Sequence, residues 1–336
     1  MKKILIIAEI GVNHNGSVSM AKKLILQAKK AGADYAKFQT FNSENVFSKK
    51  TPKAKYQKNN TNKNETALEM AKKLELTFEE HKSLKKFCDK NKIKYLSTYH
   101  DLYSLKNSYI DMDFMKIPSG DLNNHPFILE VIKKKKPILL STGASTMSEI
   151  KETVNFIIKK GFGRKNLTLL QCNSSYPTPV KDSNISVLNT YKNKFKTKIG
   201  FSDHTTDVEP SIVAVSYGAS IIEKHFTLNK SLPGPDHKAS ITPIELKNMI
   251  IGINKAMLAI GNNKKKLTKS EKLNRTIIRK SIFASRNIKI GEKFTMNNLE
   301  LMRPGNGLQP KTLFKLLGKK SKISYKKKQL IKPNSI

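Results

Sequence analysis

Two lysines stand within short apolar segments of the kind that form buried strands. Lys37 lies in the segment Tyr35–Gln39, and Lys116 lies in Phe114–Ile117. A lysine ammonium is costly to bury unless an anion meets it. Hydroxyl donors end or follow neighbouring segments of the same kind: Ser119, Ser141 and Ser202. This combination predicts a binding site for a small anion that carries a phosphate and a carboxylate.

Two histidines, His204 and His225, follow two successive apolar segments, one strand–helix unit apart. This spacing places both imidazoles within reach of one metal ion when the segments are neighbouring strands. Two neutral histidines with open coordination positions suit Mn²⁺, Zn²⁺ or a related divalent ion. His14 and His237 are further candidates for the rim of such a site. We expect the remaining three histidines to be structural: His81, His100 and His125.

The polar residues described above fall where short apolar segments end, and amphipathic helical patterns lie between these segments. Eight strand–helix units in succession indicate a (β/α)8 barrel, in which the carboxyl ends of the strands meet at one mouth. A dinucleotide-binding fold fits the sequence less well than a (β/α)8 barrel does, because Gly11–Gly16 lacks the GxGxxG turn. The expected strands are Ile4–Ala8, Tyr35–Gln39, Lys94–Thr98, Phe114–Ile117, Pro137–Ser141, Leu167–Cys172, Lys198–Ser202 and Ser220–Glu223.

The barrel pattern, over 1–261, ends near Gly261, and a small β-rich domain follows. We expect a polar, lysine-rich linker over 262–275 and a domain of short strands and Gly/Pro turns over 276–336. Between the second and third strands, Tyr56–Leu74 forms a long insertion. This insertion looks too polar to contribute to a core, and its place after a strand predicts an active-site loop.

The composition excludes several classes of protein. The chain has 336 residues and a formal net charge of +37, but only five of its 63 basic residues are arginine and it has no tryptophan. Since nucleic-acid readout favours arginine and aromatic side chains, we expect no specific nucleic-acid partner. No apolar run reaches the length of a membrane span, and Glu9 interrupts the apolar start too early for a signal peptide. We therefore expect a cytoplasmic protein without a membrane partner.

Eight stretches of the sequence resemble bacterial sialic acid synthases. Together they cover almost the whole chain in order, and several are long enough to be specific. The insertion over 52–76 resembles the subgroup that makes N-acetylneuraminate and its legionaminate relatives. The eight stretches are AEIGVNHNG (8–16), KFQTF (37–41), KIPSGDLNN (116–124), LLSTGAS (139–145), NSSYPTP (173–179), IGFSDHT (199–205), IEKHFTLNKSLPGPDHKAS (222–240) and RPGNG (303–307).

The resemblance implies a TIM barrel followed by a small antifreeze-like (SAF) domain, in a homodimer formed by a domain swap. It implies condensation of phosphoenolpyruvate with N-acetylmannosamine and water, which gives N-acetylneuraminate and phosphate, with Mn²⁺ or alternatively Mg²⁺ as cofactor. Two related products stay open: N,N'-diacetyllegionaminate, made from a 2,4-diacetamido-trideoxy-mannose, and pseudaminate, which the motifs fit less well. A polyanion-binding protein on an inactive barrel is a further alternative, but the lysine pair and the histidine pair are both intact.

The resemblance also implies roles for individual residues. His204 and His225 would bind the metal, and the residues closest to the chemistry would be Glu9, Lys116 and Asp121. Arg303 would reach the sugar from the partner subunit. Phosphoenolpyruvate would be held by Lys37, Thr98, Lys116, Ser119, Ser141, Asn173 and Ser202. The amino sugar would be met by Gln39, Asp121, Tyr176, Asp236 and Arg303.

The sequence departs from the family pattern in two places. Asp121 stands where the family more often has glutamate, whose carboxylate reaches further. Tyr99 and His100 stand where the family commonly has proline and phenylalanine. Without the proline the turn after Thr98 is less rigid, so this departure affects the phosphate contact expected from Thr98.

Overall fold

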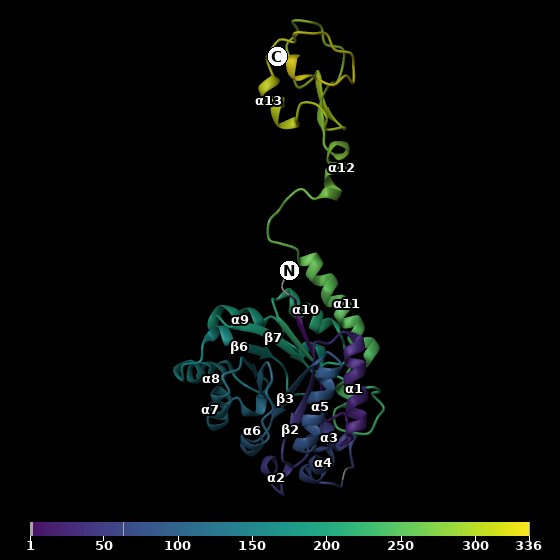
Figure 1. Cartoon of the computed structure of the whole chain (residues 1–336). Coiled ribbons are helices and arrows are strands. Elements are labelled where there is room, and N and C mark those ends of the chain that lie inside the picture. Colours follow the sequence, from purple (N-terminus) through teal and green to yellow (C-terminus); the bar gives the residue numbers. More distant parts are fainter. Residues whose placement is uncertain (1–2, 63, 336) are drawn as a thin grey trace. The chain divides into compact units, whose positions relative to one another are not determined.

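The computed structural model describes residues 3–62 and 64–335. Eight parallel strands form a closed barrel in chain order, and the last strand pairs with the first (Figure 1). The predicted (β/α)8 barrel is therefore confirmed, and each strand overlaps its predicted segment. The strands are β1 (Leu5–Gly11), β2 (Tyr35–Thr40), β3 (Lys94–Tyr99), β4 (Met115–Ile117), β5 (Ile138–Ser141), β6 (Leu167–Gln171), β7 (Lys198–Asp203) and β8 (Ile221–His225).

Helices surround the barrel and cover the outer face of its strands. The strands are apolar on both faces because inward side chains fill the barrel and outward ones pack beneath the helices. Ile7, Leu96 and Leu140 are among the fully buried residues of this core. The main outer helices are α1 (Val18–Ala31), α5 (Phe78–Lys90), α6 (Leu102–Asn107), α7 (His125–Lys133), α8 (Met147–Lys159), α9 (Val187–Phe195), α10 (Glu209–Ser216) and α11 (Pro243–Ile260).

Thr-x-x-Glu capping boxes fix where three of the outer helices begin. In each, the threonine side chain accepts from the glutamate backbone N–H, and the glutamate side chain accepts from the threonine N–H. Thr77 begins α5 in this way, Thr146 begins α8, and Thr242 begins α11. Since each helix follows a strand end or a loop at the mouth, these caps define the ends of the loops that carry the site.

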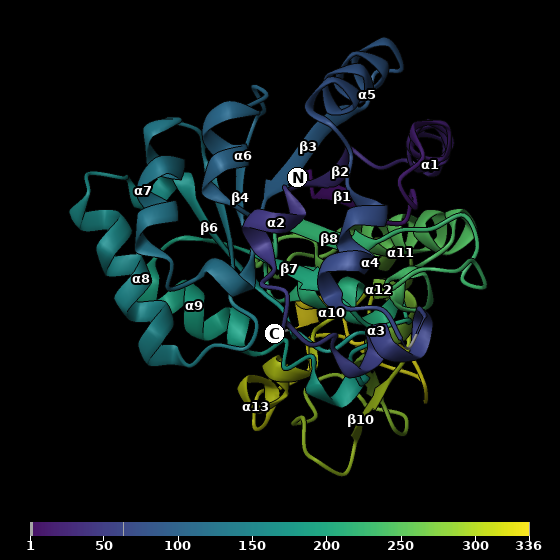
Figure 2. The same ribbon diagram turned by 90° about the horizontal axis from the view of Figure 1, so that it is seen from below.

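Three helices lie at the carboxyl ends of the strands between β2 and α5: α2 (Ser43–Val46), α3 (Lys55–Asn60) and α4 (Ala67–Leu74) (Figures 1 and 2). The predicted insertion, Tyr56–Leu74, covers α3 and α4. The expectation that it contributes nothing to a core is wrong for α4. Met70 and Leu74 of this helix are buried against Val12. The apolar spacing Ala67, Met70, Ala71, Leu74 follows one helical face and carried this information in the sequence.

Residues 262–336 form a second compact unit with its own apolar core. It contains α12 (Lys269–Ile278), an antiparallel pair of strands, β9 (Ser281–Ala284) and β10 (Leu299–Met302), and α13 (Leu313–Leu316). The segment 262–275, expected to be a linker, is helical from Lys269 onward. A capping box formed by Thr268 and Glu271 explains why the helix begins there.

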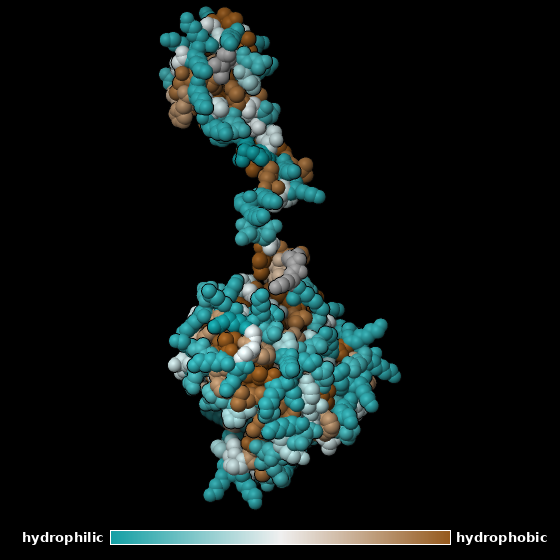
Figure 3. Space-filling view, turned by 60° about the vertical axis from the view of Figure 1, so that its left-hand side comes forward, coloured by the Kyte–Doolittle hydropathy of each residue, from teal (hydrophilic) through white to brown (hydrophobic). Residues whose placement is uncertain are grey.

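The visible surface of the barrel unit is mainly hydrophilic, as the many lysines lead one to expect (Figure 3). Among the described residues, no helix is both long and apolar enough to span a membrane. A small set of lysines departs from the surface pattern because their side chains are buried. Within the described ranges these are Lys37, Lys53, Lys116 and Lys224.

Candidate active site

A bulge in β1 shapes one side of the barrel mouth. Glu9 pairs with Lys37 and Gly11 pairs with Phe38, so β1 holds one extra residue between them. Gly11 has a φ of +54°, and a Cβ at this position would lie 3.2 Å from Glu9 Oε1. Glycine is therefore required here for both backbone and space, and the bulge sets the direction of the Glu9 side chain.

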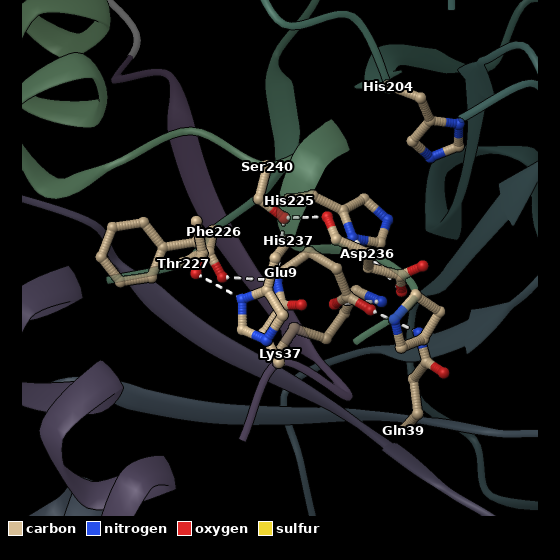
Figure 4. Close-up of polar contacts among 12 residues, drawn as sticks. Glu9, Lys37, Gln39, His204, His225, Phe226, Thr227, Asp236, His237 and Ser240 are labelled. Atoms are coloured by element: carbon tan, nitrogen blue, oxygen red, sulfur yellow. Dashed lines mark hydrogen bonds and ion pairs between the residues drawn. The ribbon is translucent and has the colours of Figure 1, made fainter. Parts of the chain in front are cut away.

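Two lysines and two glutamates form a buried cluster inside the mouth. Lys37 Nζ lies 2.7 Å from Glu9 Oε2 and 3.6 Å from Glu223 Oε2; the contact with Glu9 is drawn in Figure 4. Lys116 Nζ lies 3.1 Å from Glu223 Oε1. Lys37 also donates a hydrogen bond to Thr98 Oγ1 at 2.9 Å. The two positive and two negative charges cancel, so a bound anion would have to share the ammonium groups with these carboxylates.

Burial and charge pairing act in opposite directions on this cluster. Burial alone would raise the pKa of Glu223, but the ammonium groups of Lys116 and Lys37 outweigh burial and hold that pKa well below its usual range. For Glu9, burial outweighs the effect of Lys37, and its pKa is raised. Burial opposes the charge on Lys37, yet Glu223 and Glu9 raise its pKa. Glu9 is therefore the carboxylate of the cluster that accepts a proton more easily.

A cavity of about 270 Å³, here called the lysine cavity, includes this cluster. The buried Ser141 hydroxyl has no hydrogen-bond partner within the described residues, and the only side chain there that contacts the Lys116 ammonium is Glu223. Both groups therefore keep donors for a bound anion. The cavity brings together six of the seven residues predicted for phosphoenolpyruvate: Lys37, Thr98, Lys116, Ser119, Ser141 and Ser202.

Asn173, the seventh residue, is placed differently. Its side chain donates to the Asp182 carbonyl at 3.3 Å and accepts from the Ser175 N–H at 2.8 Å, on the wall of another cavity. Its backbone carbonyl accepts a hydrogen bond from His204 Nδ1. In this structure Asn173 therefore orients a histidine, and Ser174 lines the lysine cavity. The predicted contact between Asn173 and phosphoenolpyruvate stays a prediction.

His204 and His225 lie together at neighbouring strand ends, with their ring centres 5.3 Å apart. Burial lowers the pKa of His204 to about 4 and that of His225 well below its usual value, so both rings are neutral. Because His204 Nδ1 donates to a carbonyl, its Nε2 carries the lone pair.

These two rings fit a divalent ion. His204 Nε2 has one long contact, with Ser202 Oγ at 3.4 Å, while the Ser202 hydroxyl donates to Glu223 at 2.9 Å. His225 Nδ1 is buried without a hydrogen-bond partner in the described part of the chain, 3.8 Å from Asp236 Oδ2. No three His, Cys, Asp or Glu side chains of the described residues group closely enough to hold a metal by themselves. Oxygens of water or substrate would therefore complete the coordination.

A second cavity of about 230 Å³, here called the apolar cavity, lies beside the lysine cavity. The two share four lining residues, which form the border between them: Gln39, His100, Tyr176 and His225. Beyond this border the wall of the apolar cavity is largely apolar. Its apolar side chains include Val12, Phe41, Val46, Phe47, Met70, Ala71 and Leu74, while Tyr56, Gln57 and Asp236 add polar groups to the same wall.

Three residues predicted for the amino sugar line the apolar cavity: Gln39, Tyr176 and Asp236. Gln39 Nε2 donates to Glu9 Oε1 at 3.1 Å, as Figure 4 shows. Burial, followed by the charge of Glu9, raises the pKa of Asp236 to about 7. Asp121 lines the lysine cavity rather than the apolar one. Arg303 lies in the second unit, directly after β10, and its contact with a sugar stays a prediction.

An aromatic stack connects the insertion to the histidine pair. The ring of Tyr56, on α3, lies 5.2 Å from that of Tyr176, which in turn stacks on His204 at 4.2 Å. Asn60, at the end of the same helix, donates to the Pro235 carbonyl at 3.1 Å. The insertion therefore covers the apolar cavity and is attached to the loop that follows β8.

Comparison with known proteins gives a family for this geometry. The model of the NeuB family matches residues 24–265, and the model of the SAF domain matches residues 279–336. The chain belongs to the NeuB family. The resemblance to sialic acid synthases, with a SAF domain after the barrel, is therefore confirmed.

Relatives in the NeuB family include two proteins named N,N'-diacetyllegionaminic acid synthase. The one from Campylobacter jejuni is 44% identical over 333 residues, which cover 99% of this chain and 100% of the relative. The one from Legionella pneumophila is 38% identical over 317 residues, 93% of this chain and 89% of the relative. The crystal structure of N-acetylneuraminic acid synthetase from Leptospira borgpetersenii in complex with citrate has a TM-score of 0.71 at 32% identity, and covers 81% of this chain and 90% of that one.

Sequence reasoning did not assign a role to Glu223 in this NeuB-family chain. The structure places its carboxylate between Lys37 and Lys116, with a further hydrogen bond from Ser202 at 2.9 Å. A signal was present in the order Glu223-Lys224-His225, because alternate residues of a strand point to the same face. If His225 faces the site, then Glu223 does so as well.

The expectations for three other histidines need correction. His100, expected to be structural, borders both cavities, and burial lowers its pKa to about 4. His14 and His237, expected at the rim, are buried and line neither cavity. His14 Nδ1 accepts from the Gly16 N–H at 3.1 Å, and His237 Nδ1 lies 2.7 Å from Thr227 Oγ1 (Figure 4). Both stabilise turns behind the site.

Proposed function

We propose that this chain condenses phosphoenolpyruvate with a 2,4-diacetamido-trideoxy-mannose and water, and so makes N,N'-diacetyllegionaminate and phosphate. The sequence resemblance alone favoured N-acetylmannosamine as the sugar. The observation that changes this choice is the apolar wall of the cavity beside the lysine cavity. The names of two relatives that align with nearly the whole chain support the same sugar.

The two candidate sugars differ at their far end. N-acetylmannosamine carries hydroxyl groups there, whereas the trideoxy sugar carries a methyl group and a second acetamido group. Phe47, Met70 and Leu74 line the apolar cavity but not the lysine cavity, and they offer no side-chain hydrogen-bond partners. The polar groups of the same cavity, on Tyr56, Gln57 and Asp236, would serve the second acetamido group. A hydroxyl left without a partner costs about 1–3 kcal/mol. A buried methyl group instead contributes roughly 0.8 kcal/mol.

The lysine cavity would hold phosphoenolpyruvate. Lys116 and Lys37 supply positive charge on two sides of the cavity, and Ser119, Ser141 and Ser202 supply hydroxyl donors. The anion would take over donors that Lys116 does not use for Glu223. The same lysines would stabilise the negative charge that collects on the departing phosphate.

His204 and His225 would hold a divalent ion at the border of the two cavities, where the aldehyde of the open-chain sugar meets the enol carbon. When bound, such an ion polarises a carbonyl oxygen and makes its carbon easier to attack. Carbon 3 of phosphoenolpyruvate forms the new bond to the aldehyde carbon, and water adds to carbon 2. Loss of phosphate from carbon 2 then completes the reaction.

Asp121 is the residue that best suits removal of a proton from this water. Its Oδ1 accepts from Asn124 Nδ2 at 2.9 Å, which leaves the other oxygen available. Burial raises the pKa of Asp121, and so makes it a stronger base. It also lines an open cavity of about 650 Å³ next to the lysine cavity, through which water can arrive. Glu9 is less suitable because Lys37 and Gln39 occupy its two oxygens.

The experiment is a reaction in ¹⁸O-labelled water with Mn²⁺, phosphoenolpyruvate and each of the two sugars in turn. We expect phosphate release that requires both substrates, and a product whose mass shows two acetamido groups. Because water adds to carbon 2 and the carbon–oxygen bond breaks, the released phosphate should contain no ¹⁸O. Labelled phosphate would mean hydrolysis at phosphorus and would contradict the proposal. Absence of phosphate release with either sugar would favour the polyanion-binding alternative.

A further inference from the structure

A buried ion pair lies behind the two histidines, on the outer face of the barrel strands. Lys224 Nζ lies 2.8 Å from Asp203 Oδ2, and both side chains are 0% exposed. The two residues are direct partners in the pairing of β7 with β8. Their neighbours Ser202 and Glu223 line the lysine cavity, so Asp203 and Lys224 point to the opposite face. The proposed reaction does not use this pair.

The pair ties the segment after β7 to β8. Lys224 Nζ donates to the carbonyls of Thr205 at 2.7 Å and Asp207 at 2.8 Å, and contacts Thr205 Oγ1 at 3.0 Å. Asp203 accepts from the Thr205 N–H at 2.9 Å and from the Ser211 hydroxyl at 2.7 Å. One ammonium group thus fixes the backbone on the far side of β7, at the turn that leads into α10.

Both histidines are attached directly to this network. His204 lies between Asp203 and Thr205, which the network holds, and His225 follows Lys224. A buried ion pair is weak evidence for stability, because desolvation of the two charges offsets their attraction. The presence of the pair at this place is therefore better explained by an effect on the positions of His204 and His225 than by an effect on stability.

We propose that Lys224 and Asp203 are positioning residues that fix the separation of the His204 and His225 rings and so set the affinity for a divalent ion. The inference rests on the metal assignment in the proposed function. Residues that orient metal ligands from behind typically change metal affinity roughly 10- to 100-fold when they are replaced. The pair should therefore affect ion binding beyond any effect that it has on folding.

The test measures Mn²⁺ binding by calorimetry in the absence of substrates. The double variant Lys224→Met/Asp203→Asn removes both charges and keeps an acceptor for the Thr205 N–H. We expect its Mn²⁺ dissociation constant to rise roughly 10- to 100-fold. Its thermal midpoint in EDTA should fall as well, because the carbonyls of Thr205 and Asp207 lose their donor. A matched control is Lys53→Met/Glu65→Gln, which removes another buried pair, with side chains 1% and 9% exposed, from the insertion. This control should bind Mn²⁺ as the unmodified chain does.

A milder variant, Ser211→Ala, removes one hydrogen bond from Asp203 and covers the case in which the double variant does not fold. It should weaken Mn²⁺ binding several-fold. Unchanged Mn²⁺ affinity in the folded variants, or an equal loss in the control, overturns the positioning role. If the unmodified chain does not bind Mn²⁺ at all, the metal assignment fails together with this inference. If the unmodified chain binds Mn²⁺ and the variants bind it equally well, only this inference fails.

Discussion

Four buried charges determine how the lysine cavity receives an anion. Lys116 makes its contact with Glu223, while Glu223 is also held by Lys37 and by the Ser202 hydroxyl. Removal of the Lys116 charge therefore leaves the buried Glu223 carboxylate with partners. This makes Lys116 the better of the two lysines for a test, because its loss should affect binding more than folding.

Lys116→Met should raise the KM for phosphoenolpyruvate much more than the KM for the sugar. Loss of one charge-assisted contact costs about 1.5–3 kcal/mol, which corresponds to a roughly 10- to 100-fold change. The measurement is steady-state kinetics with each substrate varied. Lys94→Met, at the opposite end of the barrel with a side chain 62% exposed, is the control and should change neither constant. An equal rise for both substrates would indicate general damage to the site.

The sequence predicts which residues lie at the site more readily than it predicts which groups their side chains contact. Lys37, Lys116 and the two histidines were predictable because such side chains stand out at the ends of apolar strands. The role of Glu223 was not, because its carboxylate reaches from β8 to lysines on β2 and β4. Asn173 shows the same limit: its position after β6 was right, but its side chain turns to Asp182.

Helix α3 contributes one aromatic side chain to the wall of the apolar cavity. Tyr56 lines that cavity and packs against Tyr176, which also borders the lysine cavity. The helix is held in place by Asn60 on the Pro235 carbonyl. If the apolar cavity holds the sugar as proposed, the effect of the insertion on the sugar should be separable from binding of phosphoenolpyruvate.

Tyr56→Ala should raise the KM for the sugar several-fold and leave the KM for phosphoenolpyruvate nearly unchanged. An aromatic pair contributes about 0.5–1.5 kcal/mol beyond the area that it buries. Kinetics with each substrate varied measures the effect. Lys58→Ala, exposed on the same helix, is the control for a change in α3 itself. If the KM for phosphoenolpyruvate rises as much, Tyr56 supports the whole mouth rather than the sugar cavity.

The strands and helices of the barrel were predictable because apolar strands alternate regularly with capped amphipathic helices along residues 1–261. The insertion and the start of the second unit were less so. Helix α4 has only eight residues, and lysines and glutamate surround its four buried positions. Helix α12 is exposed throughout, and of its apolar residues only Leu273 falls within 262–275, so this segment has the composition of a linker.

The molecule consists of two units that differ in their histidines. All seven histidines lie before Gly261, and the second unit contains none. Burial lowers the pKa of His81 and of His237 to about 4, below the usual value of 6.5. Between these two values the unfolded barrel binds more protons than the folded one. Stability of the barrel therefore falls as the pH drops from about 6.5 to about 4.

This difference predicts two thermal transitions with different pH dependence. From pH 7 to about pH 5, the midpoint of the barrel should fall, while that of the second unit should stay nearly constant. In the second unit, the backbone N–H of Lys289 and then Arg286 lower the pKa of Glu292 to about 2. Stability from Glu292 is present above about pH 4.5 and is lost only below it. Calorimetric scans across this range check the prediction, and parallel shifts of both transitions would contradict it.

Arg303 raises a question about the whole assembly, because the expected dimer places it over the partner's barrel. His225→Ala and Arg303→Ala should each be nearly inactive alone. After subunit exchange, half of the dimers are mixed and each contains one complete site, so about a quarter of the activity should return. Phosphate release over time measures this recovery. If exchange is demonstrated and no activity returns, Arg303 does not act on a partner's barrel.

A competition experiment between the two sugars decides which of them is the substrate. The chain is given limiting phosphoenolpyruvate, Mn²⁺ and equal concentrations of N-acetylmannosamine and 2,4-diacetamido-trideoxy-mannose, and the two products are counted by mass spectrometry. Their ratio equals the ratio of the two kcat/KM values. The apolar wall formed by Phe47, Met70 and Leu74 predicts an excess of N,N'-diacetyllegionaminate of roughly tenfold or more. Equal amounts, or an excess of N-acetylneuraminate, would contradict the account.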